Sequence, residues 1–204
     1  GDNTARVWSL NTGELLHTFS VPGTGIGFAR FAPDGNRLVT ADGSTNNNVR
    51  VWNLATEQTI RSFGGSAFVQ NFEFAASGQL VTSAGVTVQV WDIETGQVIR
   101  PLPGLTQAEI VIVRFLAATN SPVMTAGCLN GRVISWDAST GQILHDFTGE
   151  GLFDLAAIPG TNQILTAHFA DQLVRVKNSQ TGETLRTFAG HTTSTIQDVG
   201  FSPD

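Results

Sequence analysis

One phrase occurs five times along the 204-residue chain and constrains its fold more than any other feature. Each copy has an apolar run that ends in Trp, a short polar turn that usually ends in Thr-Gly, and a second run that ends in Phe or Leu. The Trp position is held by Trp8, Trp52, Trp91, Trp136 and, in the fifth copy, Lys177. Successive copies are 39 to 45 residues apart. A period of roughly 40–45 residues built from strand-type phrases predicts a β-propeller.

Each repeat divides into four short strand-like runs, separated by clusters of Gly, Asn, Asp, Ser and Pro that predict turns. In the second repeat the predicted strands are 27–31, 37–40, 49–52 and 58–63. We therefore predict an all-β fold, a β-propeller of four-stranded antiparallel blades. Because a repeat buries its apolar faces only against its neighbours, residues 1–204 are expected to form a single domain. The predicted blade pieces are 1–20, 21–63, 64–102, 103–147, 148–188 and 189–204.

The two ends of the chain supply parts of a further blade, which brings the predicted number to about five. Residues 4–10 and 14–20 read as a third and a fourth strand, and Ile196 to Phe201 reads as a first strand. A ring could close by pairing these ends. The chain also starts in mid-phrase without Met, which favours an excerpt of a larger propeller. We prefer the excerpt, because a ring closed here would lack one second strand and leave an edge unpaired.

Composition narrows the classes of partner. The formal net charge is −6, and the eleven cationic residues form no basic stripe, so nucleic-acid binding is not expected. No apolar run approaches the roughly 20 residues needed to cross a bilayer, so we expect a soluble protein without membrane contact, with a cytoplasmic location preferred. Cys128 is the single cysteine, which excludes an internal disulfide and predicts a buried, inert thiol.

The usual catalytic patterns are absent from the sequence. It contains no Walker-type phosphate loop, no His-Glu-x-x-His and no cysteine pair at metal spacing. The Gly-rich segment 23–27 precedes no helix, and His17, His145 and His168 fall in different repeats. We therefore predict no catalytic residues, no metal site, no cofactor-binding residues and no cofactor.

The repeats resemble the WD-repeat β-propeller family along the whole chain. The Trp-Asp dipeptide that gives the family its name appears as Trp91-Asp92 and Trp136-Asp137. The family's Gly-His dipeptide appears as Gly190-His191. The resemblance implies a network of His, Ser or Thr, Asp and the Trp indole in each blade, although the Asp and His positions are mostly replaced here. The hydroxyl position is held by Thr40, Thr82, Thr125 and Thr166. From this resemblance we predict a structural role, rather than a binding role, for Trp8, Trp52, Trp91, Trp136, Asp2, His191 and Asp171. Closure of the ends would bring His191, Asp2 and Trp8 together.

The resemblance also implies that the loops before the first strand and between the second and third strands share one face. On this face we predict a non-catalytic scaffold that binds a protein or peptide, because propellers bind partners with variable loops on a rigid frame. The candidate partner-binding residues are Asp42, Asn46, Asn47, Glu109, Glu150, His168 and Phe169. A competing interpretation has Phe169 tucked against its blade.

Two other functions stay open on the sequence. The segment Asp92-Ile-Glu-Thr-Gly96 is similar to the Asp-x-x-Thr-Gly segments of quinoprotein repeats, which would make the chain a cofactor-binding or enzymatic propeller. Those repeats usually carry a Trp shortly after the Gly, and this chain does not. Alternatively, the end blades pair between chains, so that self-association replaces a monomeric ring. At Lys177 we expect the aliphatic stem to lie along the sheet and the ammonium to reach solvent.

Overall fold

A computed structural model describes residues 2–21, 25–43, 48–65, 67–75, 78–105, 110–116, 122–148, 151–158, 160–192, 196 and 198–201. Throughout these ranges the regular secondary structure is β-strand, which confirms the all-β prediction. Residues 1–69 and 92–97 form one compact unit, and residues 70–91 and 98–204 form a second. The single domain over 1–204 stays a prediction. In the described ranges no helix is long and apolar enough to span a membrane.

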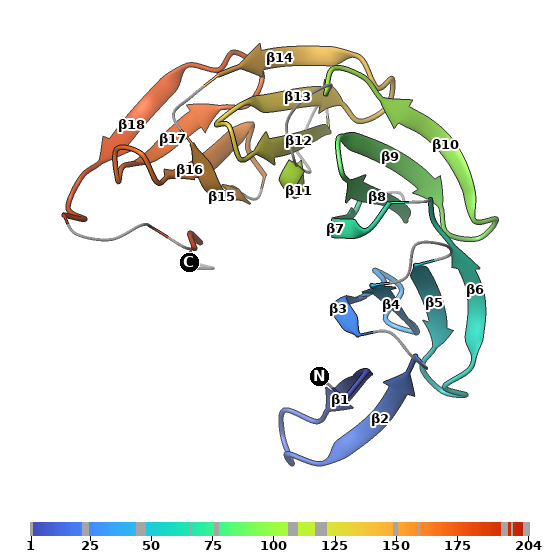
Figure 1. Cartoon of the computed structure of the whole chain (residues 1–204). Helices are drawn as coiled ribbons and strands as arrows, with labels where there is room; N and C mark the ends of the chain where they lie inside the picture. The colour runs from blue at the N-terminus through green and yellow to red at the C-terminus, as the bar shows by residue number, and fades with distance from the viewer. Residues whose placement is uncertain are drawn as a thin grey trace. The chain divides into compact units, whose positions relative to one another are not determined.

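The first unit contains a two-stranded sheet and one complete four-stranded blade (Figure 1). Strands β1 (Thr4–Trp8) and β2 (Leu15–Ser20) pair antiparallel and form the two-stranded sheet. The complete blade is antiparallel in the order β3-β4-β5-β6, with bounds β3 (Ile26–Phe31), β4 (Arg37–Asp42), β5 (Val49–Asn53) and β6 (Thr59–Phe63). The predicted turn at 32–36 joins β3 to β4, with Gly35 at φ 70°.

Three further blades follow along the chain, and most of their residues belong to the second unit (Figure 1). In each, neighbouring strands in sequence are neighbours in the sheet. The first consists of β7 (Val69–Phe74), β8 (Gln79–Ala84), β9 (Thr87–Asp92) and β10 (Gln97–Leu102). The second consists of β11 (Ile110–Leu116), β12 (Val123–Cys128), β13 (Val133–Asp137) and β14 (Ile143–Phe147). The third consists of β15 (Leu152–Ala157), β16 (Gln163–His168), β17 (Val174–Asn178) and β18 (Thr184–Phe188). The β-propeller fold with four complete blades is thereby confirmed.

The turn between the third and fourth strand of each blade is built in the same way. A residue in the left-handed region donates its N–H to the carbonyl four residues earlier, for example Gly141 to Asp137 at 2.8 Å. Glycine adopts this conformation without a Cβ clash, which explains the repeated Thr-Gly. The positions are Gly13, Glu57, Gly96, Gly141 and Gly182, with φ between 59° and 75°. Glu57 is the exception that carries a side chain.

The core lies along the middle strands and between blades. All six residues of β12 are buried, and β4 is buried from Leu38 to Asp42, whereas every residue of β18 is exposed. In the first unit, Phe19 packs with Leu38 and Trp52. In the second unit one cluster contains Leu102 and Trp136, and another contains Leu155 and Ile164. Because each of these clusters contains residues of two successive sheets, the sheets within a unit stabilise one another.

The C-terminal segment differs from the sequence prediction. Residue 196 and residues 198–201 lie outside any strand, although Ile196 to Phe201 was expected to be a first strand. The segment is held instead at Val199, whose N–H donates to Asp154 Oδ2 at 2.9 Å. A strand needs a neighbouring strand as partner for its backbone groups, and here the Val199 N–H is bound by a side chain instead.

Candidate protein-binding site

Indole N–H groups anchor the third strand of two blades to the second strand. Trp52 Nε1 donates to Thr40 Oγ1 at 2.9 Å, and Trp91 Nε1 donates to Thr82 Oγ1 at 2.8 Å. Both Trp side chains are buried, so an unpaired indole would cost about 1–3 kcal/mol. The Trp-to-Thr part of the network implied by the family resemblance is therefore present in these blades.

The next blade satisfies its Trp differently. Trp136 Nε1 donates to the carbonyl oxygen of Pro103 at 3.0 Å, a residue 33 positions earlier in the chain. Thr125, at the expected hydroxyl position, instead lies 3.2 Å from the hydroxyl of Ser135. Proline at 103 was not among the candidate partners, because a backbone carbonyl leaves no signal in a sequence.

The last complete blade replaces the Trp with Lys177. Its ammonium lies 5.1 Å from the centre of the Phe147 ring and donates to Thr184 Oγ1 at 2.9 Å. Burial, followed by the neighbouring Arg175 charge, lowers the pKa of Lys177. The ammonium therefore lies against the protein, with a cation–π contact, rather than extending into solvent as expected.

The two aspartates assigned to the network are used in local contacts. Asp2 accepts from the Thr4 hydroxyl at 2.8 Å and from Arg6 at 2.5 Å. Asp171 pairs with Arg175, which lowers the pKa of the carboxyl. Each aspartate thus braces a charged residue on the following strand. His191 is exposed, and its meeting with Asp2 and Trp8 stays a prediction.

Two of the candidate partner-binding residues support the loop face from inside. Asp42 is buried and pairs with Arg50. His168 is buried at the end of β16, where its ring Nε2 lies 3.0 Å from Thr166 Oγ1. Its backbone N–H donates to the Leu173 carbonyl oxygen at 3.1 Å. These contacts fix the strand ends from which the loops start. The other polar candidates, Asn46, Asn47, Glu109 and Glu150, lie outside the described residues.

Phe169 is exposed, as expected of a residue that contacts a partner. Its N–H donates to the Gly151 carbonyl at 3.0 Å, and its ring lies where a Cβ on Gly151 would be. The loop before β15 thus approaches the ring closely, which only glycine permits at the Gly151 φ of 46°. The ring is therefore held in place and still presents one side to solvent.

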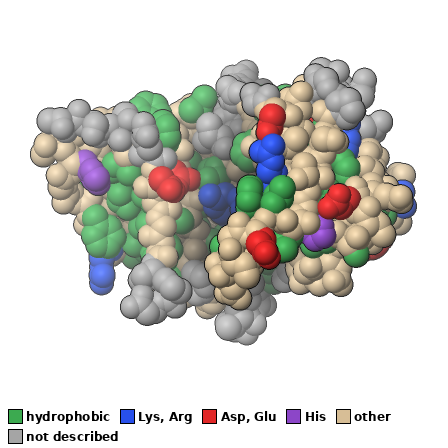
Figure 2. All heavy atoms as spheres, turned by 90° about the horizontal axis from the view of Figure 1, so that it is seen from below, with side chains coloured by type: hydrophobic (Ala, Val, Ile, Leu, Met, Phe, Trp, Pro, Cys, Tyr) green, Lys and Arg blue, Asp and Glu red, His purple; other side chains and the backbone are tan. Residues whose placement is uncertain are grey.

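Two exposed apolar side chains that the sequence reasoning did not single out lie at the same strand ends. Leu129 follows β12 as Phe169 follows β16, and Phe153 is the bulged residue beside the Leu152–His168 pair of β15 and β16. We call Leu129, Phe153 and Phe169 the loop-face patch. Apolar side chains reach the surface among polar ones in the space-filling view (Figure 2). The candidates predicted from the sequence were mostly polar or charged, so these two apolar side chains were not among them.

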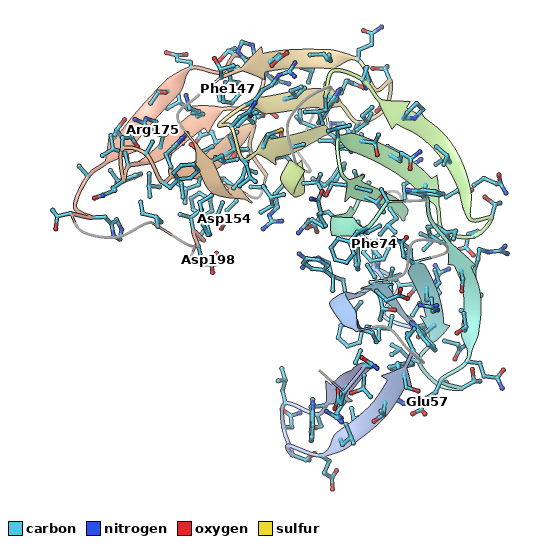
Figure 3. The ribbon with its side chains drawn as sticks, in the orientation of Figure 1. Glu57, Phe74, Phe147, Asp154, Arg175 and Asp198 are labelled. Carbon is cyan, nitrogen blue, oxygen red and sulfur yellow. The ribbon has the colours of Figure 1, made fainter. Side chains whose placement is uncertain are left out.

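A pair of carboxyl groups lies near the C-terminal segment. Asp154 on β15 and Asp198 share a side-chain hydrogen bond, and Arg114 Nη2 lies 3.9 Å from Asp154 Oδ1 (Figure 3). Burial raises the pKa of Asp154, and the Asp198 carboxyl adds to this. Within the described ranges no three His, Cys, Asp or Glu side chains gather as metal ligands do. Cys128 is buried, as predicted, and burial raises the pKa of its thiol to about 11.

Comparison with known proteins agrees with this architecture. Residues 13–53 match the family described as WD domain, G-beta repeat. The chain is 24% identical over 194 residues to Protein tipD of Dictyostelium discoideum, covering 92% of this chain and 31% of that protein. It is 28% identical over 202 residues to eukaryotic translation initiation factor 3 subunit I of Emericella nidulans, covering 91% of this chain and 59% of that protein. The chain thus spans less than a third of the first relative and about three fifths of the second.

A solved structure shows the same fold. The crystal structure of the computationally designed Ika8 protein aligns with a TM-score of 0.80 and 28% sequence identity. The alignment covers 98% of this chain and 60% of that one. The likeness in fold extends along nearly the whole chain.

Proposed function

We propose that this chain, a member of the WD-repeat β-propeller family, is a non-catalytic scaffold that binds a protein or peptide through the loop face of its blades. The family relation and the name of one relative as a subunit of a larger factor support a role in protein assemblies. The observation that carries the proposal is the loop-face patch of Leu129, Phe153 and Phe169, three exposed apolar side chains on fixed strand ends.

The chemistry of the patch suits a peptide with an apolar anchor. Aromatic side chains held rigidly lose little conformational freedom on binding, and such residues dominate the energy of protein interfaces. Asp171 and Arg175 form an ion pair close to the patch in sequence and provide a polar rim. A contiguous exposed apolar patch with a polar rim is typical of interaction sites.

The test uses two matched triple variants. In the first, Leu129, Phe153 and Phe169 are changed to Ser. In the second, Ser replaces three equally exposed apolar residues at one equivalent position of the outer strands, namely Ile60, Ile99 and Leu144. Both variants should have circular dichroism spectra and unfolding midpoints close to those of the unchanged chain, because the altered side chains are exposed.

Partners are captured from an extract with each protein, identified by mass spectrometry, and their affinities measured with purified material. We expect the loop-face variant to lose at least about tenfold in affinity, because hot-spot residues each contribute more than about 1 kcal/mol. The outer-strand variant should bind as the unchanged chain does. If both variants keep every partner, or if the outer-strand variant loses them instead, the loop face is not the binding surface.

A further inference from the structure

Within each unit, one side chain of a fourth strand contacts the turn of the blade that follows, and we call this contact a blade junction. The side chain lies four residues after the left-handed turn residue of its own blade. The side chains are His17, Arg61, Arg100 and His145. The residues that they contact or cover in the next turn are, in the same order, Glu57, Gly96, Gly141 and Gly182.

Arg100, on β10, is held against its turn by two backbone carbonyl groups. Its Nη1 donates to the carbonyl oxygen of Ser139 and, at 3.4 Å, to that of Ala138. Its Cδ lies 3.0 Å from the Cβ position of Gly141, so the side chain packs over the turn. A guanidinium has five N–H donors, and no described residue accepts a hydrogen bond from Nε or Nη2 of Arg100.

Arg100 differs in its pairing from the other half-buried arginines. Each of the other five in the described ranges pairs with a carboxylate. The pairs are Arg37 with Asp34, Arg50 with Asp42, Arg114 with Asp154, Arg132 with Asp146 and Arg175 with Asp171. No carboxylate of the described residues pairs with Arg100. A partly buried cation normally has an anionic partner, because burial weakens its contact with water.

A groove of about 310 Å³ lies beside Arg100, and we call it the Arg100 groove. Its main lining residues, all in the second unit, are Ala75, Gln79, Arg100, Phe115, Pro122 and Ala138. Gln79, Arg100, Phe115 and Pro122 are half-buried, so the groove is reached from the surface. Ligand pockets hold about 300–1,000 Å³, so this volume suits one or two side chains of a peptide.

The Arg100 groove is separate from the loop-face patch. Pro122 precedes β12 and Ala138 follows β13, whereas Leu129 follows β12 and precedes β13. The groove therefore lies at the other end of these two strands from Leu129. It is a second surface, and an inference about it does not rest on the proposed loop-face function.

The residues around the groove offer no spare carboxylate. Asp137 Oδ1 accepts from the N–H groups of Thr140 at 2.7 Å and Ser139 at 2.9 Å. The Thr140 N–H and, to a smaller extent, the Arg100 charge lower the pKa of Asp137. The segments 76–77 and 117–121, which adjoin the lining residues and lie outside the described ranges, contain no Asp or Glu.

An equivalent blade junction shows what Arg100 lacks. In the first unit His17 Nδ1 lies 3.0 Å from Glu57 Oε1, and Glu57 is the left-handed residue of its turn. The chain therefore supplies a carboxylate to the fourth-strand side chain there. At the Arg100 junction the left-handed residue is Gly141, which has no side chain to offer.

From these observations we infer that the Arg100 groove binds an acidic peptide, with an Asp or Glu carboxylate on the Arg100 guanidinium and a neighbouring apolar side chain against Phe115 and Pro122. The planar guanidinium matches the geometry of a carboxylate. Phosphate recognition uses clusters of arginines, and Arg100 is the single cation among the described residues that line the groove. The Gln79 amide can both donate to and accept from a peptide backbone.

The first test selects ligands without assuming a sequence. A phage-displayed library of short random peptides is panned on the unchanged chain and, in parallel, on the Arg100→Gln variant. We expect the unchanged chain to enrich peptides that have Asp or Glu next to an apolar residue. The Arg100→Gln variant, which keeps an aliphatic stem over Gly141, should not enrich them.

The second test measures affinities for the most enriched peptide by calorimetry. Arg100→Gln should weaken binding at least about tenfold, as expected when one partner of a hydrogen-bonded charge pair is removed. Arg61→Gln is the matched control, since Arg61 is exposed at the equivalent position, and it should bind as the unchanged chain does. Replacing the peptide's acidic residue by its amide should cause a similar loss, and the two changes together little more than either.

Urea unfolding of both arginine variants shows whether they fold, and the peptide substitution tests the contact even if Arg100→Gln does not. Three outcomes would overturn the proposal. The first is a selection without enrichment of acidic residues, and the second is equal binding to the unchanged chain and to a folded Arg100→Gln variant. The third is an equal loss with Arg61→Gln, which would indicate net charge alone.

The triple Ser variant of the loop-face patch separates the two proposals. It should bind the selected peptide with unchanged affinity, because Leu129 lies at the other end of β12 from Pro122. A peptide that loses binding to this variant and keeps it with Arg100→Gln would contradict the Arg100 groove and support the loop face. A loop face that binds no partner would leave the Arg100 measurements unaffected.

Discussion

Trp136 and Trp8 occupy the same position of the same repeated phrase, yet their surroundings differ completely. Trp136 is 0% exposed and its indole donates to Pro103, whereas Trp8 is 53% exposed on the two-stranded sheet. The local sequence around both is strand followed by a polar turn. The difference teaches that a repeat of this kind determines its own strands, while the burial of its side chains comes from the neighbouring strands and blades.

The largest expected difference in stability is between alanine variants of the two tryptophans. Trp136→Ala should lower the free energy of unfolding by about 3–5 kcal/mol, because it leaves a cavity in a cluster that includes Ile134 and Met124. Trp8→Ala should lower it by roughly 1 kcal/mol or less, since a half-exposed ring loses little burial. Urea unfolding, monitored by circular dichroism rather than by tryptophan fluorescence, measures both free energies of unfolding. Equal losses would show that Trp8 is buried in solution.

A second comparison concerns the turns under the blade junctions. Gly182→Ala and Gly13→Ala both place a Cβ at φ near 71°, which costs roughly 1–2 kcal/mol. Only Gly182 lies under His145, so its substitution should cost about 1–3 kcal/mol more from overpacking. The difference in urea midpoint isolates the junction contact. Identical midpoints would mean that the His145 ring moves aside freely.

The indole partners offer a smaller, sharper difference. Thr82→Val removes the acceptor of the buried Trp91 indole and should cost about 1–3 kcal/mol. Thr125→Val leaves the Trp136 bond to Pro103 intact and breaks only the contact with Ser135, so about 1 kcal/mol or less is expected. Thermal unfolding of the two variants under one buffer condition tests this ranking. A larger loss for Thr125→Val would reverse it.

The smallest effect is a pH dependence at Asp154. Its pKa is raised in the folded state by burial and by Asp198, above the 3.8 of a free carboxyl. A raised pKa stabilises the fold below the unfolded value, and that contribution is lost as the pH rises through the folded value. Asp154→Asn should therefore unfold at higher urea than the unchanged chain near neutral pH, and the advantage should shrink as the pH falls towards 4. An advantage independent of pH would contradict a raised pKa at Asp154.

Much of the fold could be read from the sequence because its signals are local. The alternation in strands, the turn at Gly35 and the Thr-Gly turns appear where the repeat placed them, since backbone preferences act over a few residues. The Trp52-to-Thr40 bond follows from two strands that are neighbours in sequence. The prediction of a C-terminal strand was wrong because strand formation is not a local property. A strand forms only when its backbone groups pair with a neighbouring strand.

The burial of the candidate site residues could not be predicted from the sequence. The choice of Asp42 and His168 followed residue type, and the structure buries both, whereas Leu129 and Phe153 were passed over because exposure of an apolar residue is invisible in a sequence. Lys177 also found a partner in Phe147, on another blade, that no spacing could indicate.

The sequence by itself determined the strand phrases, the left-handed turns and the absence of the usual catalytic motifs, because these depend on residues a few positions apart. Only the tertiary structure decided which copy of each phrase is covered and which is bare. Phe19 and Phe188 have equivalent local sequences, and one is buried while the other is exposed. The physical reason is that the hydrophobic effect acts on whatever surface a neighbour removes from water, and a neighbouring blade is a property of the assembled structure.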